Sequence, residues 1–235
     1  MTERQRIVGI IGGMGPLATA DLIAKITHHT PVTREQDHLR LLIDSNPAIP
    51  DRNEAVRGSG PSPGPAMVES ARLLERSGAE LLAIACNTAH HWLDDVAGAI
   101  SIPVIGMVDV TVRAAVARDP ARVGVMAITA CLATSMYQDR LVASGIESIT
   151  LDEAEQSAFT RTIAEIKAEG STEGLRASMA RHAEALIDAG AEVLIAGCTE
   201  IPIVLGEADL GVPVISSTDE LARAIVAAAR GASPR

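Results

Sequence analysis

Two cysteines of this sequence stand in matching polar surroundings that point to chemistry. Cys86 opens the segment CNTAH and Cys198 opens the segment CTE, and each comes after a short apolar run. A cysteine that only fills a core behaves as a small apolar residue, whereas reactive cysteines lie in polar, partly exposed sites. We therefore expect Cys86 and Cys198 to react and the third cysteine, Cys131, to be a spectator.

A pair of thiols is suited to moving a proton off and onto one carbon atom. The ordinary pKa of cysteine, about 8.5, is close enough to working pH for one thiolate and one thiol to coexist. If two sulfurs flank a bound α-carbon, one removes its proton and the other returns a proton to the opposite face, which is racemisation. Donors beside the cysteines could stabilise the substrate carboxylate as charge spreads onto it, namely Asn87, Thr88 and Thr199.

The neighbours of the two cysteines predict different electrostatics. Glu200 would disfavour the thiolate of Cys198, whereas a protonated His90 would favour the thiolate of Cys86. Each cysteine is also a candidate for a helix N-terminus, where the helix dipole favours a thiolate. The sequence does not indicate which cysteine serves which enantiomer.

The elements that position these residues are short strands alternating with longer helices. Apolar runs predict strands over residues 7–11, 39–44, 81–85, 103–106, 122–128, 148–151, 192–196 and 213–216. Helical spacing predicts helices over residues 67–76, 110–118, 153–168, 175–188 and 220–230. Proline and glycine predict loops over 46–53 and 58–65. This alternation is typical of an α/β fold with mainly parallel sheets and helices on both faces.

The chain also repeats itself. Gly-Ala-Glu precedes Cys86 and Cys198 at the same spacing, and each cysteine is followed by a Pro-Val pair and then an aspartate, Asp109 or Asp219, expected to cap a helix. We infer two similar doubly wound parallel-sheet halves, related by a pseudo-twofold axis, with the active site between them. The expected first domain is 1–109 plus 217–235, with Cys86, and the second is 110–216, with Cys198. Each cysteine would follow the carboxyl end of a strand, where such sheets bind ligands.

Composition excludes several classes of function. With 20 Lys and Arg against 30 Asp and Glu, the net charge is −10, the wrong sign for a protein that binds nucleic acid through its phosphates. Aromatic residues make up 1% of the chain, too few to stack on bases. We expect neither a signal peptide nor a membrane span, and a cytoplasmic location where thiols stay reduced. The cysteines and histidines show no metal-ligand spacing.

Over nearly its whole length the chain resembles the aspartate/glutamate racemase superfamily, and within it the aspartate racemase branch. The motifs are GGMGP at 12–16, NPAIPDR at 46–52, ACNTAH at 85–90 and GCTEIP at 197–202. The resemblance implies that Cys86 and Cys198 are acid and base, with no pyridoxal phosphate, no other cofactor and no metal, in a homodimer. It also implies that Arg52 and Lys167 bind substrate carboxylates. The full expected substrate-binding set is Met14, Arg52, Asn53, Asn87, Thr88, Thr129, Lys167, Thr199 and Glu200.

The resemblance favours aspartate as the small-molecule substrate. Glu200 stands where the glutamate racemase branch usually has a histidine, and the IPDR loop resembles the aspartate branch. A glutamate racemase and a broad-specificity racemase remain alternatives, because a few pocket residues decide specificity. Hydantoin racemase, maleate isomerase and decarboxylase relatives use similar cysteines, so the sequence predicts the site more firmly than the reaction.

Two other classes of function fit parts of the sequence. Residues 13–18 match G-x-G-x-x-A after a strand, and Asp44 ends the next strand, which is the pattern of a dinucleotide-binding oxidoreductase. That interpretation leaves the twin cysteine motifs unexplained. A sensor that binds an amino acid without exchanging its α-proton is the third hypothesis.

Overall fold

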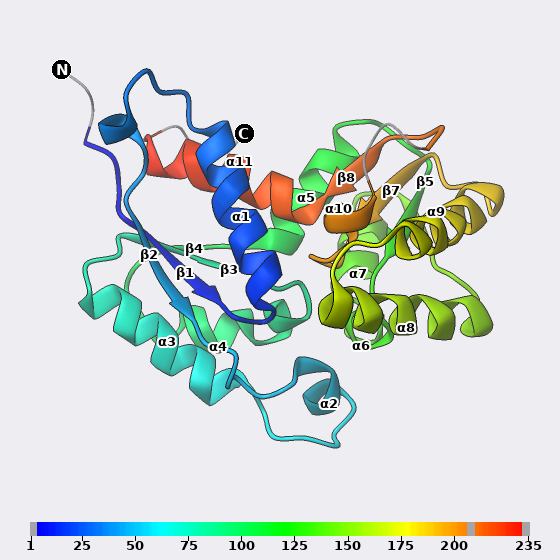
Figure 1. The fold of residues 1–235 in the computed structure, drawn as a ribbon, viewed down its shortest axis with the longest axis horizontal. Helices are drawn as coiled ribbons and strands as arrows, with labels where there is room; N and C mark the ends of the chain where they lie inside the picture. The colour runs from blue at the N-terminus through cyan, green and yellow to red at the C-terminus, as the bar shows by residue number, and fades with distance from the viewer. Residues whose placement is uncertain (1–3, 206–209, 232–235) are drawn as a thin grey trace. The chain divides into compact units, whose positions relative to one another are not determined.

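The chain folds into two compact α/β units. The computed structural model describes residues 4–205 and 210–231. One unit comprises residues 1–107 with 218–235, and the other comprises residues 108–217. Residues 1–3 and 232–235, which the sequence places in the first domain, lie outside the described residues. Each unit holds a four-stranded parallel sheet flanked by helices (Figure 1), which confirms the predicted α/β class with two similar halves.

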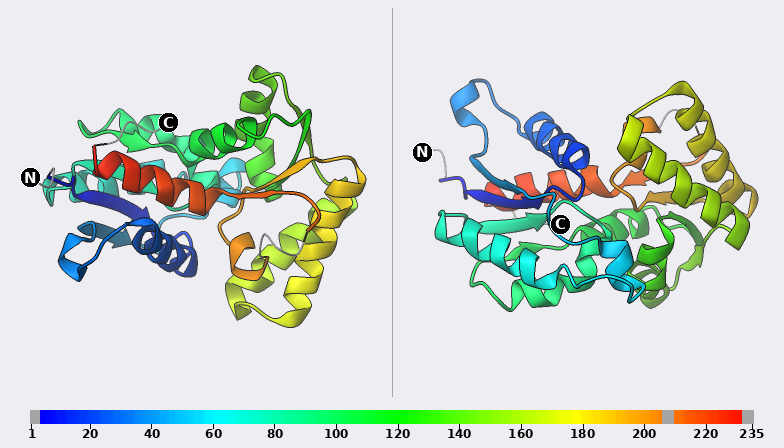
Figure 2. Two further views of the ribbon diagram at one scale, coloured as in Figure 1. Left: turned by 90° about the horizontal axis from the view of Figure 1, so that it is seen from above. Right: turned by 60° about the horizontal axis from the view of Figure 1, so that its bottom comes forward.

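The first unit is built around the interior strand β1, in the order β2-β1-β3-β4. Its strands are β1 (Val8–Gly12), β2 (Leu41–Ser45), β3 (Leu81–Ile84) and β4 (Val104–Ile105). Its helices are α1 (Pro16–His29), η1 (Glu35–Asp37), α2 (Arg52–Val56), α3 (Gly64–Arg76), η2 (Thr88–Trp92), α4 (Leu93–Ala97) and, from residue 218 onward, α11 (Ser217–Ala229). Figure 2 shows α1 and α3 on the two faces of this sheet. Since both faces are covered, β1 is buried along its whole length and its sequence is apolar without alternation.

The second unit repeats this topology with the order β6-β5-β7-β8. Its strands are β5 (Arg122–Met126), β6 (Glu147–Ile149), β7 (Val193–Ala196) and β8 (Val214–Ser216). Its helices are α5 (Met107–Val116), which starts at the unit boundary, α6 (Thr129–Ala133), α7 (Met136–Ala143), α8 (Glu153–Glu169), α9 (Glu173–Asp188) and α10 (Ile201–Val204). Helices α8 and α9 pack on each other, and α9 contacts β5.

The repeated Gly-Ala-Glu segments end the helix before each cysteine-bearing strand. After α3 comes Gly78 with φ of 99°, and after α9 comes Gly190 with φ of 97°. Glycine adopts this left-handed conformation at no steric cost, which makes it the usual residue just past a helix end. In each case the N–H of the following alanine donates to a carbonyl of the last helical turn, at 3.0 Å.

The alanine and glutamate of the repeat join the cysteine strand to its neighbour. The carboxylate of Glu80 accepts a hydrogen bond from the N–H of Ile7, just before β1, and Glu192 accepts one from the residue just before β5. A Cβ built on Gly9 of β1 or Gly124 of β5 would lie 3.0 Å from the Cβ of the repeat's alanine. The Gly-Ala-Glu repeat in the sequence thus corresponds to a structural repeat, because the same helix-to-strand connection occurs once in each unit.

The structure differs from the predicted loops and helix caps at four places. Helix α2 begins inside the predicted loop 46–53, because Asp51 accepts hydrogen bonds from two N–H groups of its first turn. Helix α3 begins inside the predicted loop 58–65, where Pro65 fits a first helical turn. Asp109 and Asp219 lie within the first turns of α5 and α11 rather than before them, and they bind Arg140 and His29 instead.

Candidate active site

Cys86 lies just past the carboxyl end of β3, in the first unit. Its side chain is buried rather than partly exposed as expected of a reactive cysteine, and it lies in the apolar cluster that also contains Met14, from the turn after β1, and Ile49, from the loop after β2. The segment after it forms the 3-10 helix η2 rather than an α-helix. Cys86 thus directly precedes the N-cap of a short helix, as expected, although this helix has only five residues. The predicted donors Asn87 and Thr88 follow at once and are buried.

His90 is held between two backbone groups. Its Nδ1 lies 2.8 Å from the carbonyl oxygen of Cys86, and its Nε2 accepts the N–H of Met107 at 2.9 Å. A backbone N–H can only donate, so Nε2 carries no proton, and Nδ1 carries the one that it donates to Cys86. The ring is neutral in this arrangement. The expectation that a protonated His90 favours the Cys86 thiolate is therefore wrong, and its role here is to tie two chain segments together.

Arg52, at the start of α2, points back to the turn that contains Met14. Its Nη1 donates to the carbonyls of Ile49 and Pro50, at 3.3 and 3.0 Å, and its Nη2 donates to the carbonyl of Met14 at 3.3 Å. Its buried Nε has no hydrogen-bond partner among the described residues, and neither has Oδ1 of Asn53. Helix α2 also contacts η2. The first unit thus brings together three predicted segments, around Met14, Arg52–Asn53 and Cys86–Asn87.

Cys198 lies just past the end of β7, in the second unit, and is bound to Glu200. Its thiol donates to Oε2 of Glu200 at 2.9 Å, and the hydroxyl of Thr199 donates to the same oxygen at 3.2 Å. The ammonium of Lys167, near the end of α8, lies 3.7 Å from Oε1. Cys198, Thr199 and Glu200 are all buried. The second unit therefore brings four predicted residues into one group, with Cys198, Thr199 and Glu200 joined by hydrogen bonds and Lys167 by an ion pair.

The surroundings of Cys198 favour the protonated thiol. Burial raises the pKa of Cys198 well above its ordinary value, and the negative charge of Glu200 raises this pKa further. The positive charge of Lys167 acts in the opposite direction. The helix that follows, α10, has only four residues, so the dipole support expected for the thiolate is small. The effect of Glu200 on the pKa of Cys198 has the sign predicted from the sequence, because the carboxylate lies in contact with the buried thiol.

Two residues of the second unit that the sequence does not single out lie close to the segments around Cys198 and Ala127. The ring of Tyr137 lies 3.2 Å from where a Cβ on Gly197 would be, so glycine precedes Cys198 because a side chain would meet that ring. Gln156 donates from Nε2 to the carbonyl of Ala127 at 2.9 Å, and its buried Oε1 has no partner among the described residues. A lone tyrosine and a glutamine on a helix give no sequence signal.

Thr129 lies apart from that hydrogen-bonded group. It begins α6, after β5, and its Oγ1 is 3.2 Å from Oγ1 of Thr160 on α8. Its strand β5 pairs with β7, so Thr129 and Cys198 follow the carboxyl ends of neighbouring strands. Cys131, two residues further on, is buried in the core cluster of the second unit, which also contains Cys198, so burial does not separate the expected spectator from the expected reactive cysteine.

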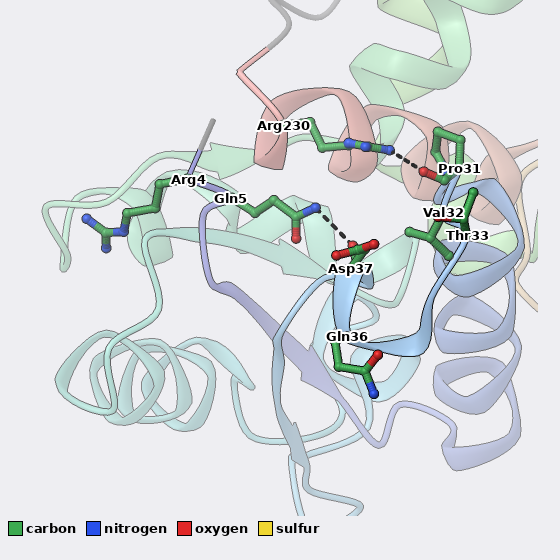
Figure 3. Close-up of a pocket in the computed structure, with 8 residues that line it drawn as sticks. All are labelled: Arg4, Gln5, Pro31, Val32, Thr33, Gln36, Asp37 and Arg230. Atoms are coloured by element: carbon green, nitrogen blue, oxygen red, sulfur yellow. Dashed lines mark hydrogen bonds between the residues drawn. The ribbon is translucent and has the colours of Figure 1, made fainter. Parts of the chain in front are cut away.

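One pocket of the first unit lies away from these residues. It is formed by segments before β1, before β2 and after α11, hence at the amino ends of the strands (Figure 3). Its polar groups already bind one another: Gln5 donates to the carbonyl of Asp37, and Arg230 donates to the carbonyl of Pro31. Among the described residues, no three histidine, cysteine or acidic side chains gather as metal ligands, and no helix is long and apolar enough to cross a membrane.

Comparisons with known proteins agree with one another. The model of the Asp/Glu/Hydantoin racemase family matches residues 11–225. The broad-specificity amino-acid racemase RacX of Bacillus subtilis is 26% identical, over 94% of this chain and 96% of that protein. The structure of Picrophilus torridus aspartate racemase superposes with a TM-score of 0.85 at 31% identity, covering 95% of this chain and 94% of that one. An aspartate racemase homologue from Pyrococcus horikoshii gives a TM-score of 0.78 at 25% identity, covering 95% and 99%.

Proposed function

The chain belongs to the Asp/Glu/Hydantoin racemase family and is an isomerase of the amino-acid racemase type, and from this premise we propose that it racemises aspartate with Cys86 and Cys198 as the two proton-transferring groups. One observation carries the proposal. Cys86 follows the carboxyl end of β3, which pairs with β1, and Cys198 follows the carboxyl end of β7, which pairs with β5. Polar residues come directly after each cysteine. Each unit therefore places one thiol at the carboxyl edge of its sheet.

The chemistry requires both sulfurs to reach one α-carbon from opposite sides. One thiolate takes the α-proton, and the other thiol gives a proton to the resulting carbanion. Arg52 supports substrate binding, because three backbone carbonyls hold its guanidinium while its Nε–H has no partner in the described part of the chain. A guanidinium fixed in this way is prepared for a carboxylate. The proposal assigns no pyridoxal phosphate and no metal to these steps, and it includes a homodimer working in the cytoplasm.

Aspartate is favoured as substrate by the similarity to the Picrophilus enzyme over nearly the whole chain. A broad-specificity racemase is the second candidate, and one observation favours it. Lys167, expected to bind a substrate carboxylate, lies against the buried carboxylate of Glu200, so part of its charge is already neutralised. A lysine shared in this way selects less strongly for a second carboxylate on the substrate. The relative activity toward aspartate, glutamate and uncharged amino acids separates the two candidates.

Proton NMR in D₂O tests the proposal. The reduced protein, without added cofactor, is incubated with either enantiomer of aspartate, glutamate and alanine, and loss of the α-proton signal is followed together with the appearance of the other enantiomer. We expect exchange with aspartate above all. Cys86→Ser and Cys198→Ser each lose racemisation by about a hundredfold or more, because each removes one proton-transferring group. Cys131→Ser, a buried cysteine outside the site, keeps wild-type activity.

Two results contradict parts of this proposal. Wild-type rates in both Cys86→Ser and Cys198→Ser would show that the thiols are not the acid and base. Exchange of glutamate alone would show that the substrate is wrong while leaving the mechanism in place.

A further inference from the structure

We propose that Tyr137 is a positioning residue for Cys198, because a chain of three buried hydroxyl groups that passes through Tyr137 holds the backbone from which this thiol projects. The inference rests on the proposed function, in which Cys198 transfers a proton, and deepens it by naming a residue on which the place of the sulfur depends. Tyr137 lies on α7 in the second unit and is the only tyrosine of the sequence.

The ring of Tyr137 covers the residue that precedes Cys198. A Cβ built on Gly197 would lie 3.2 Å from this ring, and the N–H of Gly197 donates at 2.9 Å to a carbonyl of β5. In the first unit, Ala85 precedes Cys86 and makes the equivalent hydrogen bond to β1, also at 2.9 Å. The strand therefore accepts a side chain at this place, and the glycine of the second unit makes room for the tyrosine.

The hydroxyl of Tyr137 bonds to the hydroxyls of Thr111, on α5, and Ser217, at which α11 begins. The Ser217 hydroxyl donates its one proton to the carbonyl of Ala196 at 2.8 Å, so toward Tyr137 it can only accept. The proton of Tyr137 is thereby used, and Thr111 must donate the remaining hydrogen bond. The chain of donors therefore runs in one direction and ends on the backbone two residues before Cys198.

All three hydroxyl groups lie in the interior of the second unit, where water cannot replace a lost partner. Burial raises the pKa of Tyr137 above its ordinary value, so the phenol keeps the proton that it donates to Ser217. A buried polar group that loses its partner shifts a local equilibrium by about tenfold or more. Loss of the Tyr137 hydroxyl should therefore loosen the end of β7, and with it the place of the Cys198 sulfur.

Alkylation of the cysteines tests this positioning without turnover. Tyr137→Phe keeps the ring and removes only its hydroxyl, and Ser217→Ala removes the next hydroxyl in the chain. Labelling by iodoacetamide is followed with mass spectrometry to identify each modified cysteine. We expect Cys198 to react about tenfold faster in both variants, because the segment that buries its sulfur opens more often. Cys86, in the other unit, and Cys131, in the core of the same unit, should react at their wild-type rates.

A double variant shows whether the two hydroxyls act as one chain. The effect of Tyr137→Phe combined with Ser217→Ala should be much smaller than the product of the two single effects, because both changes interrupt the same series of hydrogen bonds. Ser144→Ala is the matched control. It removes an exposed hydroxyl at the end of α7, which bonds only to a carbonyl of its own helix, and it should leave alkylation and racemisation unchanged.

Racemisation provides a second measurement. In Tyr137→Phe we expect kcat to fall by about tenfold and KM to stay within about twofold of the wild-type value. The reason is that these hydroxyls bond to one another and to the backbone, and not to Arg52 or Lys167, the residues assigned to the substrate carboxylates.

The outcomes separate this proposal from the proposed function. Wild-type labelling of Cys198 in both single variants would overturn the positioning role, and so would an equal rise for Cys131, because the whole unit would then be opening. If Tyr137→Phe does not fold, Ser217→Ala decides alone, since it removes the last link to the backbone. If the wild-type protein racemises no amino acid while labelling of Cys198 rises as expected, the positioning role stands and the proposed reaction fails.

Discussion

The polar residues that follow the two cysteines make different contacts with them. Glu200 accepts a hydrogen bond from the thiol of Cys198, whereas the ring of His90 bonds to the backbone carbonyl of Cys86. The sequence identifies both cysteines because polar neighbours follow them at once. It cannot show what His90 does, because its second partner, Met107, is distant along the chain and meets it only through the fold. Glu200, by contrast, is a neighbour in the sequence, and its effect could be predicted.

His90 should matter for stability before it matters for proton transfer. Replacing it with alanine removes the acceptor of the Met107 N–H and the donor to the Cys86 carbonyl, both in a buried place. A buried polar group that loses its partner costs about 1–3 kcal/mol. We therefore expect His90→Ala to lower the free energy of unfolding by about 2–3 kcal/mol, measured by urea denaturation, and to lower racemisation as the Cys86 segment loosens.

The control for this prediction is His28→Ala. His28 is exposed on α1, so its loss should change the free energy of unfolding by no more than about 0.5 kcal/mol. Equal effects of the two substitutions would mean that the two hydrogen bonds of His90 contribute little to folding.

Among the elements, the strands are predicted best and the helix starts least well. Each of the eight predicted strands overlaps a strand of the structure. The interior strands β1, β3, β5 and β7 are buried and therefore leave continuous apolar runs, whereas the edge strands β2, β4 and β6 are only partly buried. The short helices after Cys86 and Cys198 could not be predicted, since a few polar residues suit a 3-10 turn and an α-helix equally well. The Gly-Ala-Glu repeat was visible in the sequence, but its cause, a helix end joined to a strand, appears only in three dimensions.

The glycine of this repeat gives a prediction at the same scale. A Cβ on Gly78 would meet no atom within 4 Å, and neither would one on Gly174, but Gly78 has φ of 99° whereas Gly174 lies at the start of α9. The pair therefore separates backbone strain from packing. Gly78→Ala should lower the free energy of unfolding by about 1–2 kcal/mol, the cost of the left-handed conformation. Gly174→Ala should leave it unchanged or raise it by up to about 1 kcal/mol. Thermal or urea unfolding measures both, and equal effects would rule out strain at Gly78 as the reason for the glycine.

For the molecule as a whole, the organising feature is that one chain carries two units of the same topology, each with one of the two cysteines that we propose as proton-transferring groups. Composition and periodicity predict this, because the strand-to-helix alternation and the repeat both extend over the full sequence. The negative net charge is also a property of the whole, and it explains why an anionic substrate needs cations fixed locally. Arg52 and Lys167 are the cations that the proposal assigns, one in each unit.

The division of the cysteines between two units predicts the result of a mixing experiment. If one chain supplies both thiols of a site, then Cys86→Ser and Cys198→Ser chains, mixed and refolded together so that subunits can exchange, should remain inactive in the D₂O assay. A site shared between two chains of a dimer would instead regain activity, because some pairs would bring an intact Cys86 and an intact Cys198 together. The matched control is Cys131→Ser refolded with Cys86→Ser. This mixture should show the activity expected from its content of Cys131→Ser chain, because each Cys131→Ser chain retains both Cys86 and Cys198. Recovery of activity in the first mixture would place the two cysteines of a site on different chains, whereas the second mixture should show simple dilution in either case and so controls for the refolding.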